Sequence, residues 1–528
     1  MIALEIYSEN HSILAMSCYI CWSCNSLNQR NQAAFLLRTK QTTMKNSTLR
    51  LRFSAIGLLF LAFFVYSCAR NPVTGKRQLM LVSEKREKAM GLAYDPEVIQ
   101  EFGLYDDKKI QDFINEYGKK MGKISHRPTV DYQFRVLDSP VVNAFAVPGG
   151  YVYFTRGIMA HFNNEAEFAG VLGHEIGHVA ARHSAQQQSQ QILAQIGFIG
   201  AMLASEKFRQ YSDLAQTGLG LMFLKFSRNH ESQSDKLGVE YSTKIGYDAH
   251  QMAGFFNTIK RIQDASGSNV PTFLSTHPDP GDRYVRVNAL ATKEQAKAAS
   301  PKNLEVNRDR YLRMIDGLVY GEDPQQGYVE NNVFYHPQLK FQFPTPSGWQ
   351  TVNSTSQVQI APKDGKAAIV FTLAGEKTLA QAKQAAISAD SLKVLDSQNI
   401  RVNGNDAIAL KADLNPQVRL LMYLIQYNGN IYKFAGLAET PSFTANEANF
   451  EKTFKGFKAL TDQSKINVYA DKIKIVTVAK DGALNDVLKA NKQDSKRLEE
   501  IAILNGMQLT DKVKKGMLVK TLVKGDGK

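Results

Sequence analysis

Cysteine is almost absent from this chain of 528 residues, and none lies after Cys68. The part after Cys68 can therefore form no internal disulfide and no zinc site with thiolate ligands. The spacing of Cys18, Cys21 and Cys24 is typical of a metal or cluster site. These three cysteines precede the expected start of the protein, so we assign no site to them.

Long apolar runs and basic clusters are missing as well. Residues 53–66 are too few to span a bilayer comfortably, and the mostly apolar segment 192–204 is shorter still. We expect 192–204 to be a buried or interfacial helix and a candidate lid. The formal net charge is +14, but no basic cluster with interleaved aromatic residues is present. We therefore expect no nucleic-acid partner.

The N-terminal region predicts an exported lipoprotein. Residues 1–43 fit poorly with the rest and are expected to be a non-native extension before a start at Met44. Residues 44–67 combine basic residues with a short apolar run and lead into V-Y-S-C, which resembles a bacterial lipobox. We expect a signal peptide at 44–67, cleavage before Cys68 and lipidation of Cys68. The alternative is an N-terminal membrane anchor that is never cleaved.

Residues 163–184, NNEAEFAGVLGHEIGHVAARHS, have the pattern of a helix that carries a metal site. An asparagine can cap its start, and its apolar residues recur at 3.6-residue spacing. His174 and His178 lie one turn apart, so their imidazoles can bind one zinc ion. Glu175 would stand beside the open metal position, where a carboxylate can take a proton from water held by the metal. The alternative is an ordinary helix with a polar exposed face.

A zinc site needs at least one more protein ligand, and residues 227–247 offer candidates. Glu231 and Asp235 are four residues apart and would share one face of a second helix. Taken alone, such a carboxylate pair is usually just solvated.

The order H-E-x-x-H and then E-x-x-x-D resembles the HtpX and CAAX-prenyl-protease group of zinc metallopeptidases. Residues 143–159, NAFAVPGGYVYFTRGIM, resemble the strand-turn-strand that precedes the zinc helix in that group. Further matches are Arg182 with His183, and the His277-Pro278 loop with its trailing Arg283. Together these pieces cover about residues 71–290.

The resemblance implies the ligand set and the branch of the family. It implies one Zn2+ per chain, held by His174, His178 and Glu231, with Asp235 orienting a ligand histidine. The chain lacks the long membrane spans of the HtpX and CAAX members and a 34-residue helical repeat. It is therefore similar to the soluble lipoprotein branch of BepA-type periplasmic proteases.

Two features near the expected zinc site have more than one interpretation. His277 could donate to the oxyanion formed during peptide cleavage. It could instead occupy the open zinc position and keep the enzyme inactive, or it could be a simple loop histidine. The strand with Asn143, Ala144, Phe145 and Ala146 could bind substrate as an added strand, or could be an ordinary sheet edge.

The predicted fold class is α+β, in several domains. Residues 68–326 are expected to be a mainly helical zincin-type metallopeptidase domain with a small sheet. Within it, residues 84–124 are expected to be helical, with a break at Asp95-Pro96. Residues 327–462 alternate like strands and predict an α+β domain of unknown role. Residues 470–528 predict a small βααβ domain.

The last domain resembles a LysM module over residues 473–523, which implies binding to peptidoglycan. The alternative is a small packing module without affinity for glycans.

These features predict a lipid-anchored zinc metalloendopeptidase of the bacterial cell envelope. It would lie on the periplasmic side, at the outer membrane because Ala69 is not acidic, and would cleave misfolded or stalled envelope proteins. The first alternative is an envelope assembly or peptidoglycan-binding factor in which proteolysis is latent or secondary. A third possibility is an amidase that cuts peptidoglycan peptides.

Overall fold

The computed structural model describes residues 68–204, 226–266, 273, 276–277, 283–297, 303–389 and 392–525. The chain divides into two compact units, residues 1–81 and residues 82–528. The expected extension (1–43) and signal peptide (44–67) lie outside the described residues, and lipidation of Cys68 stays a prediction.

The described residues of the first unit form one β-hairpin. Strand β1 (Cys68–Arg70) pairs antiparallel with β2 (Arg77–Leu79). The side chain of Asn71 holds the connecting turn, because its Oδ1 accepts hydrogen bonds from the backbone N–H groups of Val73 and Thr74 at 2.8 and 3.0 Å.

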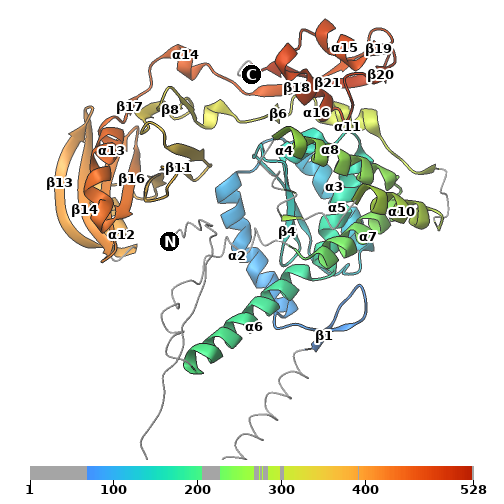
Figure 1. Ribbon diagram of the computed structural model, residues 1–528, viewed down its shortest axis with the longest axis horizontal. Helices are drawn as coiled ribbons and strands as arrows, with labels where there is room; N and C mark the ends of the chain where they lie inside the picture. The colour runs from blue at the N-terminus through green and yellow to red at the C-terminus, as the bar shows by residue number, and fades with distance from the viewer. Residues whose placement is uncertain are drawn as a thin grey trace, which may run out of the picture. The chain divides into compact units, whose positions relative to one another are not determined.

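The second unit begins with helices gathered around a small sheet (Figure 1). Strand β5 lies in the middle, parallel to β3 on one side and antiparallel to β4 on the other, which leaves β4 at an edge. The elements are α2 (Glu84–Phe102), α3 (Lys108–Ile124), β3 (Gln133–Leu137), β4 (Ala144–Val147), β5 (Tyr151–Thr155), α4 (Arg156–His161), α5 (Glu165–Ala180), α6 (His183–Ala204), α7 (Arg228–Lys244), α8 (His250–Ser266), α10 (Arg283–Gln295) and α11 (Arg308–Met314).

The expected helix break at Asp95-Pro96 is wrong. Helix α2 runs through Pro96 and ends at Gly103, which has a φ of 70° and donates its N–H to the carbonyl of Ile99. The carboxylate of Asp95 is fixed by Arg135, which donates two hydrogen bonds at 2.6 and 2.5 Å. Proline has no N–H group, so the helix lacks one hydrogen bond at this point. The Arg135–Asp95 ion pair links the middle of α2 to β3, and this tertiary contact outweighs the helix-breaking tendency of Pro96.

Helices α5 and α7 approach each other unusually closely at two glycines. A Cβ atom on Gly173 would lie 3.0 Å from the Cα of Gly238, and a Cβ on Gly238 would lie 2.8 Å from the carbonyl oxygen of Gly170. Only residues without side chains fit at this crossing. The two helices that carry the H-E-x-x-H and E-x-x-x-D motifs therefore pack backbone against backbone.

Residues 327–462 contain two antiparallel sheets and two helices. The larger sheet has seven strands in the order β10-β11-β12-β16-β15-β14-β13, and the smaller has the order β17-β9-β8-β7. Separate apolar clusters include residues of α13 and of α12. The elements are β7 (Tyr328–Glu330), β8 (Val333–His336), β9 (Phe341–Pro344), β10 (Gln350–Asn353), β11 (Gln357–Ala361), β12 (Ala367–Ala374), α12 (Leu379–Ala389), β13 (Lys393–Val402), β14 (Asn405–Asn415), β15 (Val418–Tyr427), β16 (Asn430–Glu439), α13 (Phe443–Lys455) and β17 (Lys458–Ala459).

The C-terminal module (residues 470–528) has the expected strand-helix-helix-strand order, and α14 (Gln463–Ile466) precedes it. Its outer strands β18 and β21 pair antiparallel, and β6 from the segment after α11 joins β18. The elements are β6 (Val319–Tyr320), β18 (Asp471–Thr477), β19 (Gly482–Ala483), α15 (Leu484–Ala490), α16 (Leu498–Leu504), β20 (Lys512–Val513) and β21 (Leu518–Lys524).

The mixed α+β class is thus confirmed. The zincin and LysM-like types, and the domain boundaries at 326/327 and 462/470, stay predictions.

A buried lysine of the C-terminal module reaches into the first helices. Lys520 in β21 is fully buried, and its Nζ donates to the carbonyls of Ala160, Phe162 and Leu504 at 2.8, 2.7 and 2.8 Å. Three acceptors match the three N–H donors of an ammonium group. Burial lowers the pKa of Lys520, and the Glu167 carboxylate opposes that shift. The module is therefore anchored at the end of α4, just before α5.

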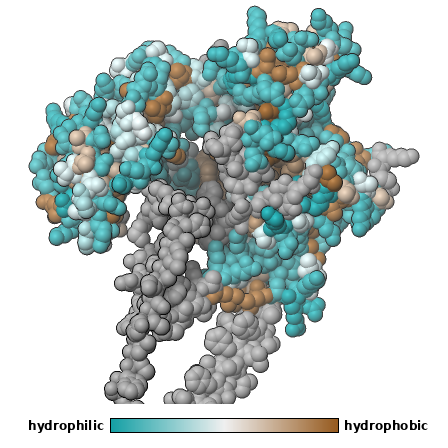
Figure 2. All heavy atoms as spheres, viewed as in Figure 1, coloured by the Kyte–Doolittle hydropathy of each residue, from teal (hydrophilic) through white to brown (hydrophobic). Residues whose placement is uncertain are grey.

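Among the described residues, no helix combines the length and apolar character that crossing a membrane requires. The segment 192–204, expected to be a helix, forms the second half of α6. Its role as a lid stays a prediction. The face of the molecule in Figure 2 is mostly hydrophilic, with hydrophobic residues in small separate groups.

Replacing Lys520 tests this anchor. In Lys520→Met, three buried carbonyls lose their donor, so we expect stability to fall by about 1–3 kcal/mol. Thermal melting of the full-length protein should show a lower Tm. The exposed Lys489→Met, in the same module, is the control and should melt like the wild type. Equal Tm values for the two variants would contradict the anchoring role.

Candidate metal centre

Helix α5 carries His174, Glu175 and His178 and is held firmly at its start. Asn164 caps it by accepting the N–H of Glu167, whose carboxylate in turn accepts the N–H of Asn163 at 2.7 Å. Every residue from Glu165 to Ala180 is buried. The helix therefore has no exposed polar face, and its histidines point into the protein.

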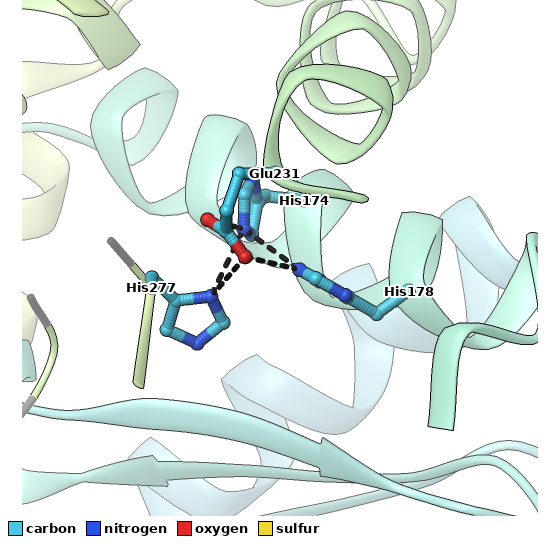
Figure 3. A group of neighbouring side chains, drawn as sticks. All are labelled: His174, His178, Glu231 and His277. Atoms are coloured by element: carbon cyan, nitrogen blue, oxygen red, sulfur yellow. Dashed lines mark hydrogen bonds and ion pairs between the residues drawn. The ribbon is translucent and has the colours of Figure 1, made fainter. Parts of the chain in front are cut away.

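Helix α7 and the segment around His277 complete the group. Ser227 caps α7, and one turn later Glu231 and Asp235 lie on its buried face. Figure 3 shows the Glu231 carboxylate between the rings of His178 and His277, with His174 beside it. His277 is fully buried and stacks on Phe273, with ring centroids 4.8 Å apart.

The side chains of His174, His178, Glu231 and His277 converge on one point. One ligand atom from each lies within 4.8 Å of the others. Glu231 lies 3.5 Å from His174 Nε2 and 3.4 Å from His178 Nε2, and these two nitrogens are 3.0 Å apart. His277 Nδ1 lies 3.1 Å from Glu231 Oε1 and 3.3 Å from His174 Nε2. The spacing and the donor types are those of a metal site.

Asp235 sets the tautomer of His174. Its Oδ1 lies 3.0 Å from His174 Nδ1, and a carboxylate can only accept, so Nδ1 carries a proton toward Asp235 and Nε2 faces the centre. Buried Arg283 donates to the same carboxylate at 2.5 Å. Although burial opposes it, Arg283 and His174 hold the pKa of Asp235 below its usual range.

A second chain of hydrogen bonds sets the tautomer of His178. His183 Nε2 lies 3.0 Å from the Gln233 side-chain oxygen, and His183 Nδ1 lies 3.0 Å from His178 Nδ1. Because Gln233 accepts, Nε2 of His183 carries its proton and Nδ1 of His183 accepts from His178. Burial lowers the pKa of His183 to about 3, which keeps this ring neutral.

These two chains turn the Nε2 atoms of both histidines toward each other. His174 Nε2 and His178 Nε2 are 3.0 Å apart, and although burial opposes it, the Asp235 and Glu231 carboxylates raise the pKa of His174 to about 9. Glu231 Oε2 is buried there without a hydrogen-bond partner. A shared cation satisfies all three groups at once, so the residues fit a metal ion with nitrogen and oxygen ligands.

Glu175 lies beside this group and is ready for proton transfer. Both of its carboxylate oxygens are buried without a hydrogen-bond partner, and Oε1 is 3.6 Å from His277 Nε2. Burial raises the pKa of Glu175. A carboxylate with a raised pKa next to a metal site is suited to act as general acid and base.

The structure brings the other predicted site residues close to the group. Phe145 and Ala146 of edge strand β4 line a small hollow together with His277 and Phe226. Ala144 lies in the same strand, and Asn143 directly precedes it with a buried side chain. Cys68 lies in the first unit, described separately above.

Sequence reasoning left His183 as either a surface residue or one that supports a ligand from behind, and the structure places it behind His178. The signal was the Arg182-His183 pair directly after α5. Arg182 adopts a left-handed φ of 61°, held by Glu87 at 3.0 Å and by the carbonyl of Val82 at 2.8 Å. This strained turn starts α6 at His183 and brings its ring onto His178.

Comparison with known proteins agrees with this geometry. Residues 106–291 match the model described as Peptidase family M48. The chain is 30% identical over 195 residues to the mitochondrial metalloendopeptidase OMA1 of Arabidopsis thaliana, covering 37% of this chain and 38% of that protein. It is 26% identical over 261 residues to the beta-barrel assembly-enhancing protease of Escherichia coli strain K12, covering 47% and 52%. The chain thus spans about half or less of each relative.

The role of His183 leads to a test by metal affinity. In His183→Leu the Nδ1 proton of His178 loses its acceptor, so we expect zinc to bind about 10–100-fold more weakly. His183→Gln can supply an amide oxygen and should restore much of the affinity. The half-exposed His250→Leu is the control. Competition with a chromophoric chelator measures all four proteins, and equal affinity in His183→Leu would disprove the positioning role.

Proposed function

Because residues 106–291 form a Peptidase family M48 domain, we propose that this protein is a zinc-dependent endopeptidase of the bacterial cell envelope. The observation that carries the proposal is the buried set of His174, His178 and Glu231, with Glu175 beside it. The lipobox-like sequence before Cys68 supports the envelope, as do relatives named beta-barrel assembly-enhancing protease. The proposed substrates are misfolded or stalled envelope proteins.

His174, His178 and Glu231 hold one zinc ion, and Asp235 and His183 keep the imidazoles in the right tautomer. When bound, zinc supplies a Lewis acid that lowers the pKa of water and polarises a carbonyl. Glu175 takes the proton of the attacking water and delivers a proton to the leaving amine. Its burial and raised pKa favour both transfers.

Substrate binds as an added strand along β4. The open edge of β4 supports this, because main-chain groups on an edge can pair with an extended peptide. Phe145 and Ala146 line the hollow that contains His277, so a peptide paired there would run past the metal group.

His277 holds the enzyme off by filling the fourth ligand position. Its Nδ1 lies 3.1 Å from Glu231 Oε1 and 3.3 Å from His174 Nε2, which favours a role at the site over that of a simple loop histidine. To ligate, Nδ1 would exchange the proton that it shares with Glu231 for the metal ion. An oxyanion donor would instead leave the ligand position free for water.

The complete burial of the group also favours a second candidate function. Glu175 and Glu231 are 0% exposed, so proteolysis could be latent in a protein that serves mainly in envelope assembly. In both cases we propose a lipid anchor at Cys68 in the outer membrane and contact with peptidoglycan through residues 473–523. If the Glu175→Gln protein fully rescues the envelope defect of a deletion strain, assembly is the main role.

Removing the base tests the peptidase itself. Glu175→Gln keeps the shape of the site but cannot accept a proton, so casein cleavage by the zinc-loaded protein should fall by about 100-fold or more. Zinc content should stay at one ion per chain, as in the wild type. No zinc in either protein and no cleavage would rule out the proposed enzyme.

Removing His277 separates its two functional roles. His277→Ala frees the fourth ligand position, so we expect faster casein cleavage than in the wild type at equal zinc content. The half-exposed His250→Ala, outside the metal group, is the control. Slower cleavage in His277→Ala would instead support the oxyanion role.

A further inference from the structure

A second cavity lies away from the metal group, between the first helices and the C-terminal module. Its volume is about 600 Å³, within the range of small-ligand sites. Four parts of the second unit line it: residues 140–161, Ile262 of α8, residues 319–328 and residues 469–524. We call it the junction cavity. None of the four residues of the metal group lines it.

A buried histidine presents a hydrogen-bond acceptor to the junction cavity. His161 is 8% exposed, and its Nδ1 lies 2.7 Å from the carbonyl oxygen of Gly157. A carbonyl can only accept, so Nδ1 carries the proton and Nε2 has a free lone pair. Nε2 has no hydrogen-bond partner in the part of the chain that the structure describes.

The cations that line the cavity are already bound. Arg497 donates to Glu500 at 2.8 and 2.9 Å and is also ion-paired with Asp471. Lys524 lies 3.1 Å from Asp471. The Tyr320 hydroxyl is bonded to Glu500, and the Tyr328 hydroxyl donates to the carbonyl of Lys465 at 3.2 Å. Arg497 is therefore committed to the two carboxylates, whereas Lys524 is paired with Asp471 alone and its side chain is 80% exposed.

One of the carboxylates, by contrast, remains available. Glu322 is exposed, lines the cavity and has no ion-pair partner among the described residues. Burial raises the pKa of Glu322, and Arg156, the cation whose charge opposes that rise, is itself paired with Asp138 at 2.6 Å. The lining therefore has three carboxylates, Glu322, Asp471 and Glu500, against two cations.

We propose that the junction cavity binds an ammonium or guanidinium group, supplied by a lysine or arginine side chain of a polypeptide. Glu322 would pair with the charge, and the free Nε2 of His161 would accept one of its N–H donors. Tyr320, Tyr328 and Tyr469 line the same space, and aromatic rings attract cations. An anion would meet the unpaired carboxylate of Glu322 and the lone pair of His161, so anionic ligands do not fit.

The test is calorimetric titration of the full-length protein with capped amino acids. Nα-acetyl-arginine methylamide and Nα-acetyl-lysine methylamide should bind, whereas the norleucine analogue, of similar length but uncharged, should not. Spermidine tests the other source of ammonium groups. Binding of spermidine without the capped amino acids would overturn the polypeptide source.

Matched variants locate the site. Glu322→Gln should weaken binding of the arginine analogue by about threefold to fivefold, as expected for a partly exposed ion pair. Glu116→Gln removes an equally exposed carboxylate outside the cavity and should bind like the wild type. His161→Leu should weaken binding too. Because His161 is buried, this variant could unfold at a lower temperature, and the test would then depend on Glu322→Gln alone.

Several results would overturn the proposal. These are no binding of either cationic analogue, equal binding by wild type and Glu322→Gln, or N-acetylglucosamine binding as tightly as the arginine analogue. Glu175→Gln should bind the analogues normally, so the outcome does not depend on whether the metal group is an active peptidase.

Discussion

The close contact of α5 and α7 at Gly173 and Gly238 is the constraint on which the metal group depends. It lets Glu231 reach within 3.5 Å of both His174 and His178. A methyl group at this crossing would push the helices apart and separate the ligands. Asp235 and His183 then orient the imidazoles, so the chemistry of the site follows from backbone packing plus two chains of hydrogen bonds.

Periodicity and motif spacing predicted the ligand helix, because His174 and His178 share a face of any α-helix. Glu231 was predicted only by resemblance, since carboxylates four residues apart are common on exposed helices. His277 too was placed near the zinc site only by resemblance, because the spacing between distant segments is set by tertiary packing. The predicted helix break at Pro96 was wrong for the same reason, because the Arg135–Asp95 ion pair stabilises a helix that the local sequence disfavours.

The C-terminal module was expected to be a separate binding domain, yet it is tightly joined to the first helices. Besides the Lys520 anchor, Arg308 donates to the carbonyl of Leu518, and Arg261 donates to that of Met507, both at 2.8 Å. No sequence signal marks such a lysine, because lysine is almost always exposed. The resemblance to LysM modules therefore describes the order of its elements, and its role includes supporting the segment before α5.

The Lys520 anchor also orders events during synthesis. Lys520 lies 360 residues after Ala160, so these hydrogen bonds close only after residue 520 has left the ribosome. Contacts between such distant segments form late, because a long loop must close first. The base of the ligand helix is thus among the last parts to become rigid. A nascent chain would carry the complete H-E-x-x-H motif well before the hydrogen bonds of Lys520 to the segment before α5 can form.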